Sequence, residues 1–113
     1  MVDRIASVSL DRLVHNERKP ALVLFSGEWC GDCAAFAPLW KRWTFGRTEP
    51  IYTIEVLRGA SEWEDWEIDE IPTVVAYSDG AEKGRSAGTI LEKDLDGLLR
   101  HVTQTKVAKK GSP

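Results

Sequence analysis

The chain has 113 residues, of which 42% are hydrophobic and 29% charged, and its formal net charge is −3. This length and balance are typical of one compact globular domain with one core. The small negative charge argues against a strongly basic nucleic-acid surface and against a polybasic membrane anchor. We therefore expect neither nucleic-acid nor membrane partners.

The start of the chain, MVDR, mixes charges and lacks the apolar stretch of a signal peptide. The longest unbroken apolar run, 21–25, is far too short to cross a membrane. Both observations predict a cytoplasmic protein.

The first part of the chain predicts alternating strands and helices. A weak extended segment covers 5–8, and Ser9 is placed to cap a short helix that ends before Pro20. The continuous apolar run 21–26 is typical of a central strand in a sheet that is covered on both faces. Apolar side chains at steps of three and four then predict a helix over 31–43.

This helix contains Pro38, which predicts a kink because proline removes one backbone hydrogen bond and clashes with the preceding turn. A strand over 51–57 and an acidic helix over 60–67 follow. The apolar run 74–77 predicts a further buried strand.

The dipeptide Asp-Gly at 79–80 predicts a tight hairpin turn, and a short antiparallel strand follows that ends near Gly88. An amphipathic helix over 91–102 closes the domain. The predicted order is βαβαββα, which indicates an α/β fold with a central mixed sheet flanked by helices. We assign 1–105 to a single domain and expect 106–113 to be a disordered basic tail.

Two cysteines, Cys30 and Cys33, lie just beyond the end of the predicted strand 21–26. A disulfide between them closes so small a loop that it adds little stability, which favours a chemical role over a structural one. Cys30 falls at a helix N-terminus, where free backbone N–H groups and a partial positive charge favour a thiolate nucleophile. Cys33 follows on the same face and can resolve a mixed disulfide by attacking Cys30.

The same C-x-x-C spacing is also half of a zinc site, which needs about four ligands. His15 and His101, one near each end, are the only histidines, and there is no second cysteine pair. We therefore expect no metal, and a metal or cluster site shared between two chains remains the alternative.

Three landmarks in order resemble the thioredoxin family: the segment LVLFSGEWCGDC, the proline Pro38 in the following helix, and the tripeptide IPT at 71–73. The resemblance implies the thioredoxin fold and a thiol–disulfide oxidoreductase that reduces protein disulfides, with Cys30 as nucleophile and Cys33 as resolving cysteine. A non-catalytic binding module of the same fold is the alternative, and the intact cysteines and proline loop argue against it.

The resemblance also implies a substrate groove beside the cysteines. Pro72 would follow a cis peptide bond and face the disulfide, and the backbone of Ile71 would pair with an extended substrate. Trp29, Ala87 and Gly88 would line the same groove. Taken alone, Ala87 and Gly88 are better explained by packing or by a turn, and packing explains Trp29 as well as the groove does. Their joint spacing with the cysteines favours the groove.

The chain departs from the family where a buried carboxylate usually lies six residues before the nucleophile, because that position is Leu24. The lysine that usually accompanies the acid is replaced by Thr53 or Glu55, depending on the alignment. We hypothesise that the proton of the resolving cysteine is released slowly, or that water or an acidic neighbour such as Asp32 or Glu28 accepts it.

A second departure lies between the cysteines, where Asp32 replaces the usual proline and follows Gly31. The Asp32 carboxylate opposes a thiolate at Cys30, and it also favours the helix N-terminus. With a glycine in the motif and no histidine between the cysteines, we expect a reductant rather than an oxidant.

The expected partners are disulfide-containing proteins and an electron donor, either a thioredoxin-reductase-like protein or a small thiol. We expect a monomer with no cofactor beyond the redox-active disulfide. Six acidic residues and no basic one lie from Glu62 to Glu70, interleaved with Trp63 and Trp66. A solvated face with core tryptophans is the simpler interpretation, and a site for a basic substrate is the alternative.

Overall fold

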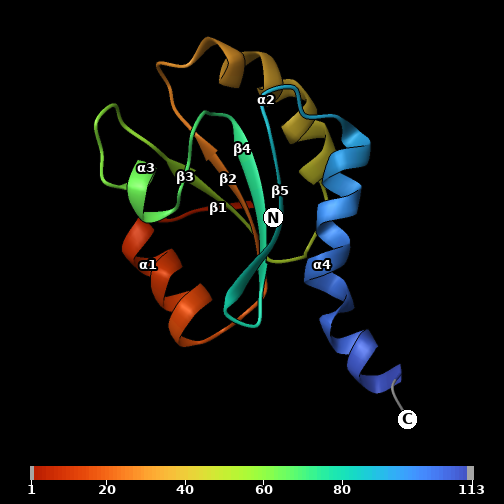
Figure 1. Cartoon of the computed structure of the whole chain (residues 1–113). Coiled ribbons are helices and arrows are strands. Elements are labelled where there is room, and N and C mark those ends of the chain that lie inside the picture. Colours follow the sequence, from red (N-terminus) through yellow and green to blue (C-terminus); the bar gives the residue numbers. More distant parts are fainter. Residues whose placement is uncertain (1, 112–113) are drawn as a thin grey trace.

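A five-stranded mixed sheet with helices on both faces forms the centre of the computed structural model, which describes the backbone of residues 2–111 and the side chains of residues 3–103 (Figure 1). The elements in chain order are β1 (Val2–Arg4), α1 (Ser7–Asp11), the π-helical turn η1 (Arg12–Asn16), β2 (Ala21–Ser26), α2 (Gly31–Thr44), β3 (Ile51–Glu55), α3 (Glu62–Asp65), β4 (Thr73–Ser78), β5 (Ala81–Ala87) and α4 (Glu92–Gly111).

The strand order across the sheet is β1-β3-β2-β4-β5. The strands β1, β3 and β2 run parallel to one another, and β4 and β5 are antiparallel to their neighbours. From β2 onward the elements follow the predicted order βαβαββα, with β1 and the first helix preceding it. The predicted mixed α/β sheet is therefore confirmed.

Both faces of the sheet are buried, as the continuous apolar run of β2 predicts. Val23 and Phe25 point to one face and pack with Leu10 of α1 in one core cluster. Leu22 and Leu24 point to the other face and pack in a second cluster with α2 and α4. The helices α2 and α4 thus cover this second face of the sheet (Figure 1).

The N-terminus differs from the predicted extended segment over 5–8 followed by a helix capped at Ser9. Strand β1 is formed by Val2–Arg4, and the helix starts at Ser7 with Ala6 as its N-cap residue. The Ile5 N–H donates a hydrogen bond to the Thr53 carbonyl oxygen at 3.1 Å. Pairing with the distant strand β3 therefore determines where β1 lies and where the helix starts. Local propensity does not include such long-range pairing.

The predicted acidic helix over 60–67 is reduced to the four residues of α3. Glu67 adopts a left-handed φ of 52°, and the Ile68 N–H donates to the Trp63 carbonyl oxygen at 2.8 Å, which ends the helix. Trp66, only 7% exposed, contacts the rings of Phe25 and Tyr77 in the core. Burial of this one ring is what draws the segment onto the sheet.

The predicted hairpin turn is confirmed, since Asp79 and Gly80 both have positive φ angles, 54° and 82°. It leads into the edge strand β5, where the guanidinium of Arg85 forms an ion pair with Glu82 at 2.7 Å. Lys83 adds an exposed charge to this edge.

Helix α4 extends to Gly111, and Ser112 and Pro113 lie outside the described residues. The domain limit at 105 and the tail over 106–113 stay predictions. Among the described residues, no helix has the length and apolar character needed to span a membrane.

Candidate active site

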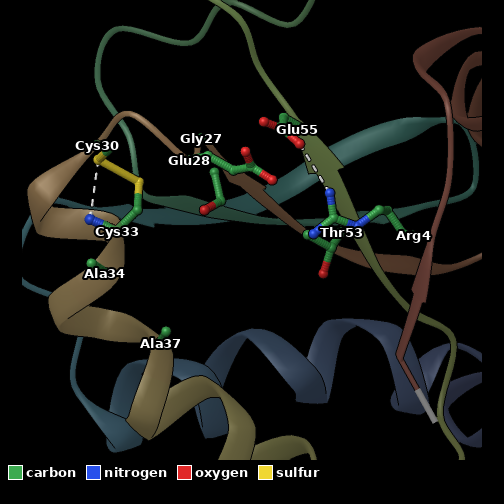
Figure 2. A pocket seen from close by; sticks show the side chains of 10 residues that line it. Arg4, Gly27, Glu28, Cys30, Cys33, Ala34, Ala37, Thr53 and Glu55 are labelled. Carbon is green, nitrogen blue, oxygen red and sulfur yellow. Dashed lines mark hydrogen bonds and ion pairs between the residues drawn. A yellow bond between two sulfur atoms is a disulfide. The ribbon is translucent and has the colours of Figure 1, made fainter.

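Cys30 and Cys33 form a disulfide at the junction of β2 and α2. Cys30 is the N-cap residue of α2, and its sulfur accepts a hydrogen bond from the Cys33 N–H at 3.1 Å (Figure 2). When the pair is reduced, the same N–H group and the positive end of the helix stabilise a thiolate on Cys30. The fold thus places the first cysteine where the sequence predicts it.

The two sulfur-bearing residues differ in their access to solvent. Cys30 is half-buried, whereas Cys33 is only 5% exposed and belongs to the core. An incoming disulfide can therefore reach the sulfur of Cys30 and not that of Cys33.

The loop before β4 lies against this disulfide. The peptide bond between Ile71 and Pro72 is cis, and the Ile71 carbonyl oxygen is 3.5 Å from the sulfur of Cys30. Segments 41 residues apart in sequence thus meet at the reactive sulfur.

A shallow groove runs past Cys30 on the side of this loop. Trp29 is 38% exposed there, and its indole N–H donates to the Val56 carbonyl oxygen at 3.0 Å. The guanidinium of Arg58 lies 4.4 Å above the Trp29 ring, and the Trp63 ring lies 6.3 Å from it. The residues that line the groove are Trp29, Cys30, Gly31, Asp32, Arg58, Trp63, Glu70 and Ile71.

Four predicted groove residues, Trp29, Gly31, Asp32 and Ile71, share this groove with Cys30. The remaining three, Pro72, Ala87 and Gly88, do not line it. Ala87 lies opposite Thr73 in the sheet, and the Gly88 N–H donates to the Pro72 carbonyl oxygen at 3.2 Å. Gly88 has a φ of 75°, and a Cβ there would lie 3.3 Å from the Glu70 carboxylate. Ala87 and Gly88 thus hold the start of β4 and the proline loop in place through contacts with Thr73 and Pro72.

Gly27 is a supporting residue that the sequence analysis did not single out. A Cβ at this position would lie 2.9 Å from the Trp29 indole nitrogen, 3.0 Å from the Val56 carbonyl oxygen and 3.1 Å from Ile71 Cδ1. Only glycine leaves room for these three residues to converge. A small residue two positions before a tryptophan gives no recognisable signal in one sequence.

A second hollow lies on the opposite side of the disulfide, beneath Cys33 (Figure 2). It contains an ion pair between Arg4 and Glu55, with the guanidinium nitrogen 3.0 Å from the carboxylate oxygen. Glu28 also lines this hollow, whereas Asp32 lies in the groove on the other side. The complete lining is Arg4, Ser26, Gly27, Glu28, Cys30, Cys33, Ala34, Ala37, Thr53 and Glu55.

Within the residues whose side chains are described, no group of three or more His, Cys, Asp and Glu side chains could hold a metal ion. The site therefore consists of two sulfurs, a proline loop and two flanking hollows. Such an arrangement can exchange one disulfide for another by thiolate attack.

The family model named Thioredoxin matches residues 2–103. The chain belongs to the thioredoxin family. It is 32% identical over 98 residues to the thioredoxin of Mycoplasmoides gallisepticum, and the match covers 80% of this chain and 91% of that one.

Solved thioredoxin structures have the same fold. The X-ray structure of Fasciola hepatica thioredoxin superposes with a TM-score of 0.70 at 26% identity, covering 89% of this chain and 99% of that one. The crystal structure of Schistosoma mansoni thioredoxin gives a TM-score of 0.72 at 23% identity, covering 88% and 94%. The predicted thioredoxin fold is confirmed.

As a member of the thioredoxin family, the chain is a thiol–disulfide oxidoreductase with a redox-active C-x-x-C pair, Cys30 and Cys33. Its general partners are protein disulfides and reductase-type electron donors. In the sheet, Leu24 pairs in register with Thr53 and Ser26 with Glu55.

Proposed function

We propose that the chain reduces protein disulfides in two steps, with Cys30 as nucleophile and Cys33 as resolving thiol. The observation that carries this assignment is the difference in access between the half-buried Cys30 and the 5% exposed Cys33. The N–H group of Cys33, 3.1 Å from the Cys30 sulfur, supports the Cys30 thiolate before attack.

In the first step the Cys30 thiolate attacks one substrate sulfur, and the second substrate sulfur leaves as a thiol after taking up a proton. In the second step the Cys33 thiolate attacks Cys30, the bond between Cys30 and the substrate breaks, and the disulfide of the protein forms. Two electrons pass from the protein to the substrate disulfide. An external reductase or a small thiol then restores the dithiol.

The substrate lies along Ile71 as an extended segment that adds to the backbone of the proline loop. The carbonyl oxygen of Ile71, 3.5 Å from the Cys30 sulfur, supports this placement. Trp29 and Trp63 offer apolar contact area in the same groove. Pro72 and Gly88 shape the loop, and the hydrogen bond from the Gly88 N–H to the Pro72 carbonyl oxygen supports this role.

The charges of the groove favour substrates with mixed charges. Arg58 supplies a cation stacked on Trp29, and Asp32 and Glu70 supply carboxylates. The acidic stretch takes part only through Trp63 and Glu70, since Trp66 is a core residue. Trp66 is thus a core tryptophan, as the simpler interpretation expects, whereas Trp63 lines the groove.

Single-cysteine variants test the two roles. With a peptide disulfide, Cys33→Ser should accumulate a mixed disulfide at Cys30 that mass spectrometry detects, whereas Cys30→Ser should form none. Equal trapping by both variants would contradict the assignment. Failure of the unmodified protein to reduce any disulfide would favour a binding module, and bound zinc in the purified protein would favour a shared metal site.

The reduction potential tests the direction of transfer. A value near about −270 mV fits a general reductant, whereas about −180 mV or higher would indicate isomerase or oxidase work. Thiol buffers of graded composition, followed by trapping of free thiols, give this value. The cytoplasmic location and the monomeric state stay predictions, which cell fractionation and sedimentation test.

A further inference from the structure

The parallel strands under the disulfide change character along their length. On the face covered by α2, the apolar residues Leu22, Leu24 and Ile51 belong to the core. Towards the carboxyl ends of the same strands, polar side chains face the hollow beneath Cys33 instead: Ser26, Thr53 and Glu55, joined by Arg4 of β1. The polar cluster thus begins where the apolar core ends.

Register explains how these residues meet. Arg4 and Leu24 each pair with Thr53, and Ser26 pairs with Glu55. Since side chains repeat every second residue on one face, Ser26 and Glu55 stand one repeat beyond Leu24 and Thr53. Arg4 stands level with Thr53, so its ion pair with Glu55 extends from that level towards the carboxyl end of β3.

The Arg4–Glu55 pair is suited to hold a carboxylate in a fixed place. The guanidinium nitrogen and the carboxylate oxygen are 3.0 Å apart, and the side chain of Glu55 is only 28% exposed. Arg4 reaches over from β1 and is 66% exposed, so it orients Glu55 while its own charge remains hydrated. The pair lines the same hollow as Cys33 (Figure 2).

We propose that Glu55, held by Arg4, accepts the proton of Cys33 during resolution of the mixed disulfide. This inference rests on the proposed function and deepens it. Cys33 is nearly buried, so its thiol proton can leave only through a hollow that reaches it. Cys33, Ser26 and Glu55 all line this hollow.

In this step the proton of the Cys33 thiol passes through the hollow to the Glu55 carboxylate. The resulting thiolate attacks Cys30, a new disulfide forms, and the substrate sulfur leaves with the electron pair of the broken bond. Glu55 then returns the proton to solvent or to the departing sulfur.

Other ionisable groups face the same region and could compete. Glu28 lines the hollow from the loop after β2, and Lys41 of α2 lines a neighbouring hollow that shares Arg4, Cys33 and Thr53 with it. Glu28 is exposed and forms no ion pair among the residues whose side chains are described. Glu55 is the carboxylate that the fold fixes in position.

The test is a single-turnover experiment in which formation and resolution of the mixed disulfide are followed separately by acid quench and mass spectrometry. Glu55→Gln should leave formation unchanged and slow resolution about tenfold near pH 6. The deficit should shrink as pH rises towards about 9, because hydroxide then removes the proton directly. Glu55→Asp should recover part of the rate.

Two variants separate this role from alternatives. Glu82→Gln removes a glutamate from an ion pair on β5, far from the hollow in the fold, and should leave both steps unchanged. A loss of resolution in Glu28→Gln with none in Glu55→Gln would overturn the inference and assign the role to Glu28. Equal slowing of Glu55→Gln at all pH values would indicate a structural effect and would also overturn it.

The proposed function fails in a different way. If the unmodified protein forms no mixed disulfide at all, the two-step mechanism itself is wrong. If both steps occur and Glu55→Gln resolves as fast as the unmodified protein near pH 6, only the inference about Glu55 is wrong.

Discussion

Leu24 lies directly opposite Thr53 across the parallel ladder of β2 and β3, and both line a neighbouring hollow that also includes Cys33. Neither side chain can carry a charge, so both members of the family's buried pair are absent together. Removing both is less costly than removing one, because a single buried charge without its partner is strongly destabilising.

Restoring the acid should therefore be harmful to stability. Leu24 is 5% exposed and packs among Phe36 and Trp40, so Leu24→Asp should lower the free energy of unfolding by about 3 kcal/mol or more near neutral pH. The loss should diminish as pH falls, since protonation removes the buried charge. Urea unfolding at several pH values measures it. A variant as stable as the unmodified protein at neutral pH would show that this position is solvated.

The same variant tests whether the missing acid limits resolution. If Glu55 already accepts the Cys33 proton, Leu24→Asp should change the resolution rate less than about threefold. Rapid acid quench of the mixed disulfide gives this rate. Much faster resolution in Leu24→Asp would mean that proton transfer is slow in the natural chain.

Gly27→Ala should disturb the groove because its Cβ would meet Trp29 and the backbone oxygen of Val56 within 3.0 Å. We expect a loss of about 1–3 kcal/mol in stability, since the backbone cannot move away as easily as a side chain can. Gly31→Ala is the matched control, because nothing lies within 4 Å of its Cβ. Chemical unfolding of both variants measures the difference, and equal stabilities would refute the steric argument.

Arg58 should select substrates by charge. Its guanidinium stacks on Trp29, which leaves its N–H edge free to bind a carboxylate beside the substrate cysteine. Arg58→Glu should lower kcat/KM about threefold to tenfold for peptide disulfides with a neighbouring Asp. The same peptides with Asn should respond less.

Charge reversal at Glu64 and Asp65 provides the comparison for Arg58. These two residues are exposed and do not line the groove with Cys30. The double variant should change the rates for acidic and basic peptides little. If it changes them as much as Arg58→Glu does, selection is a property of the overall charge and not of Arg58.

Tyr77 should make stability fall at alkaline pH. Burial raises the pKa of Tyr77 well above its usual value, with a smaller contribution from Glu82 in the same direction. Because the pKa is higher in the folded state than in the unfolded state, this contribution is complete below about pH 10 and is lost above it.

The expected slope is up to about 1.4 kcal/mol of unfolding free energy per pH unit above pH 10 for one such group. Tyr77→Phe should flatten this decline, and urea unfolding between about pH 9 and about pH 12 would measure it. Burial also raises the pKa of Tyr52, so part of the decline in unfolding free energy should remain in the Tyr77→Phe variant. An unchanged slope in Tyr77→Phe would contradict the prediction.

Local sequence signals predict those parts of the molecule that local chemistry determines. The cysteine pair marks the start of α2, the apolar run marks β2, and Asp79 with Gly80 marks the hairpin. Each of these depends on residues next to one another in the chain. The thioredoxin landmarks add the Ile71–Pro72 loop, which the structure brings to Cys30.

Contacts between distant segments are what the sequence leaves undetermined. Arg4 and Arg58 gave no signal, because their importance depends on the strand register and on the position of Trp29. The pairing of Leu24 with Thr53 and of Ser26 with Glu55 likewise depends on the register of β2 against β3. The helix over 60–67 was predicted too long because the burial of Trp66 outweighs helical propensity there.

The charged edge strand β5 has a consequence for the behaviour of the protein at high concentration. Exposed strand edges can template pairing with other chains, and charged side chains along an edge discourage it. Glu82, Lys83 and Arg85 place three charges within four residues there, and the opposite edge is the three-residue strand β1. One edge strand is charged and the other is only three residues long, so neither edge readily pairs with a strand of another chain. The protein should therefore resist edge-to-edge aggregation at high concentration.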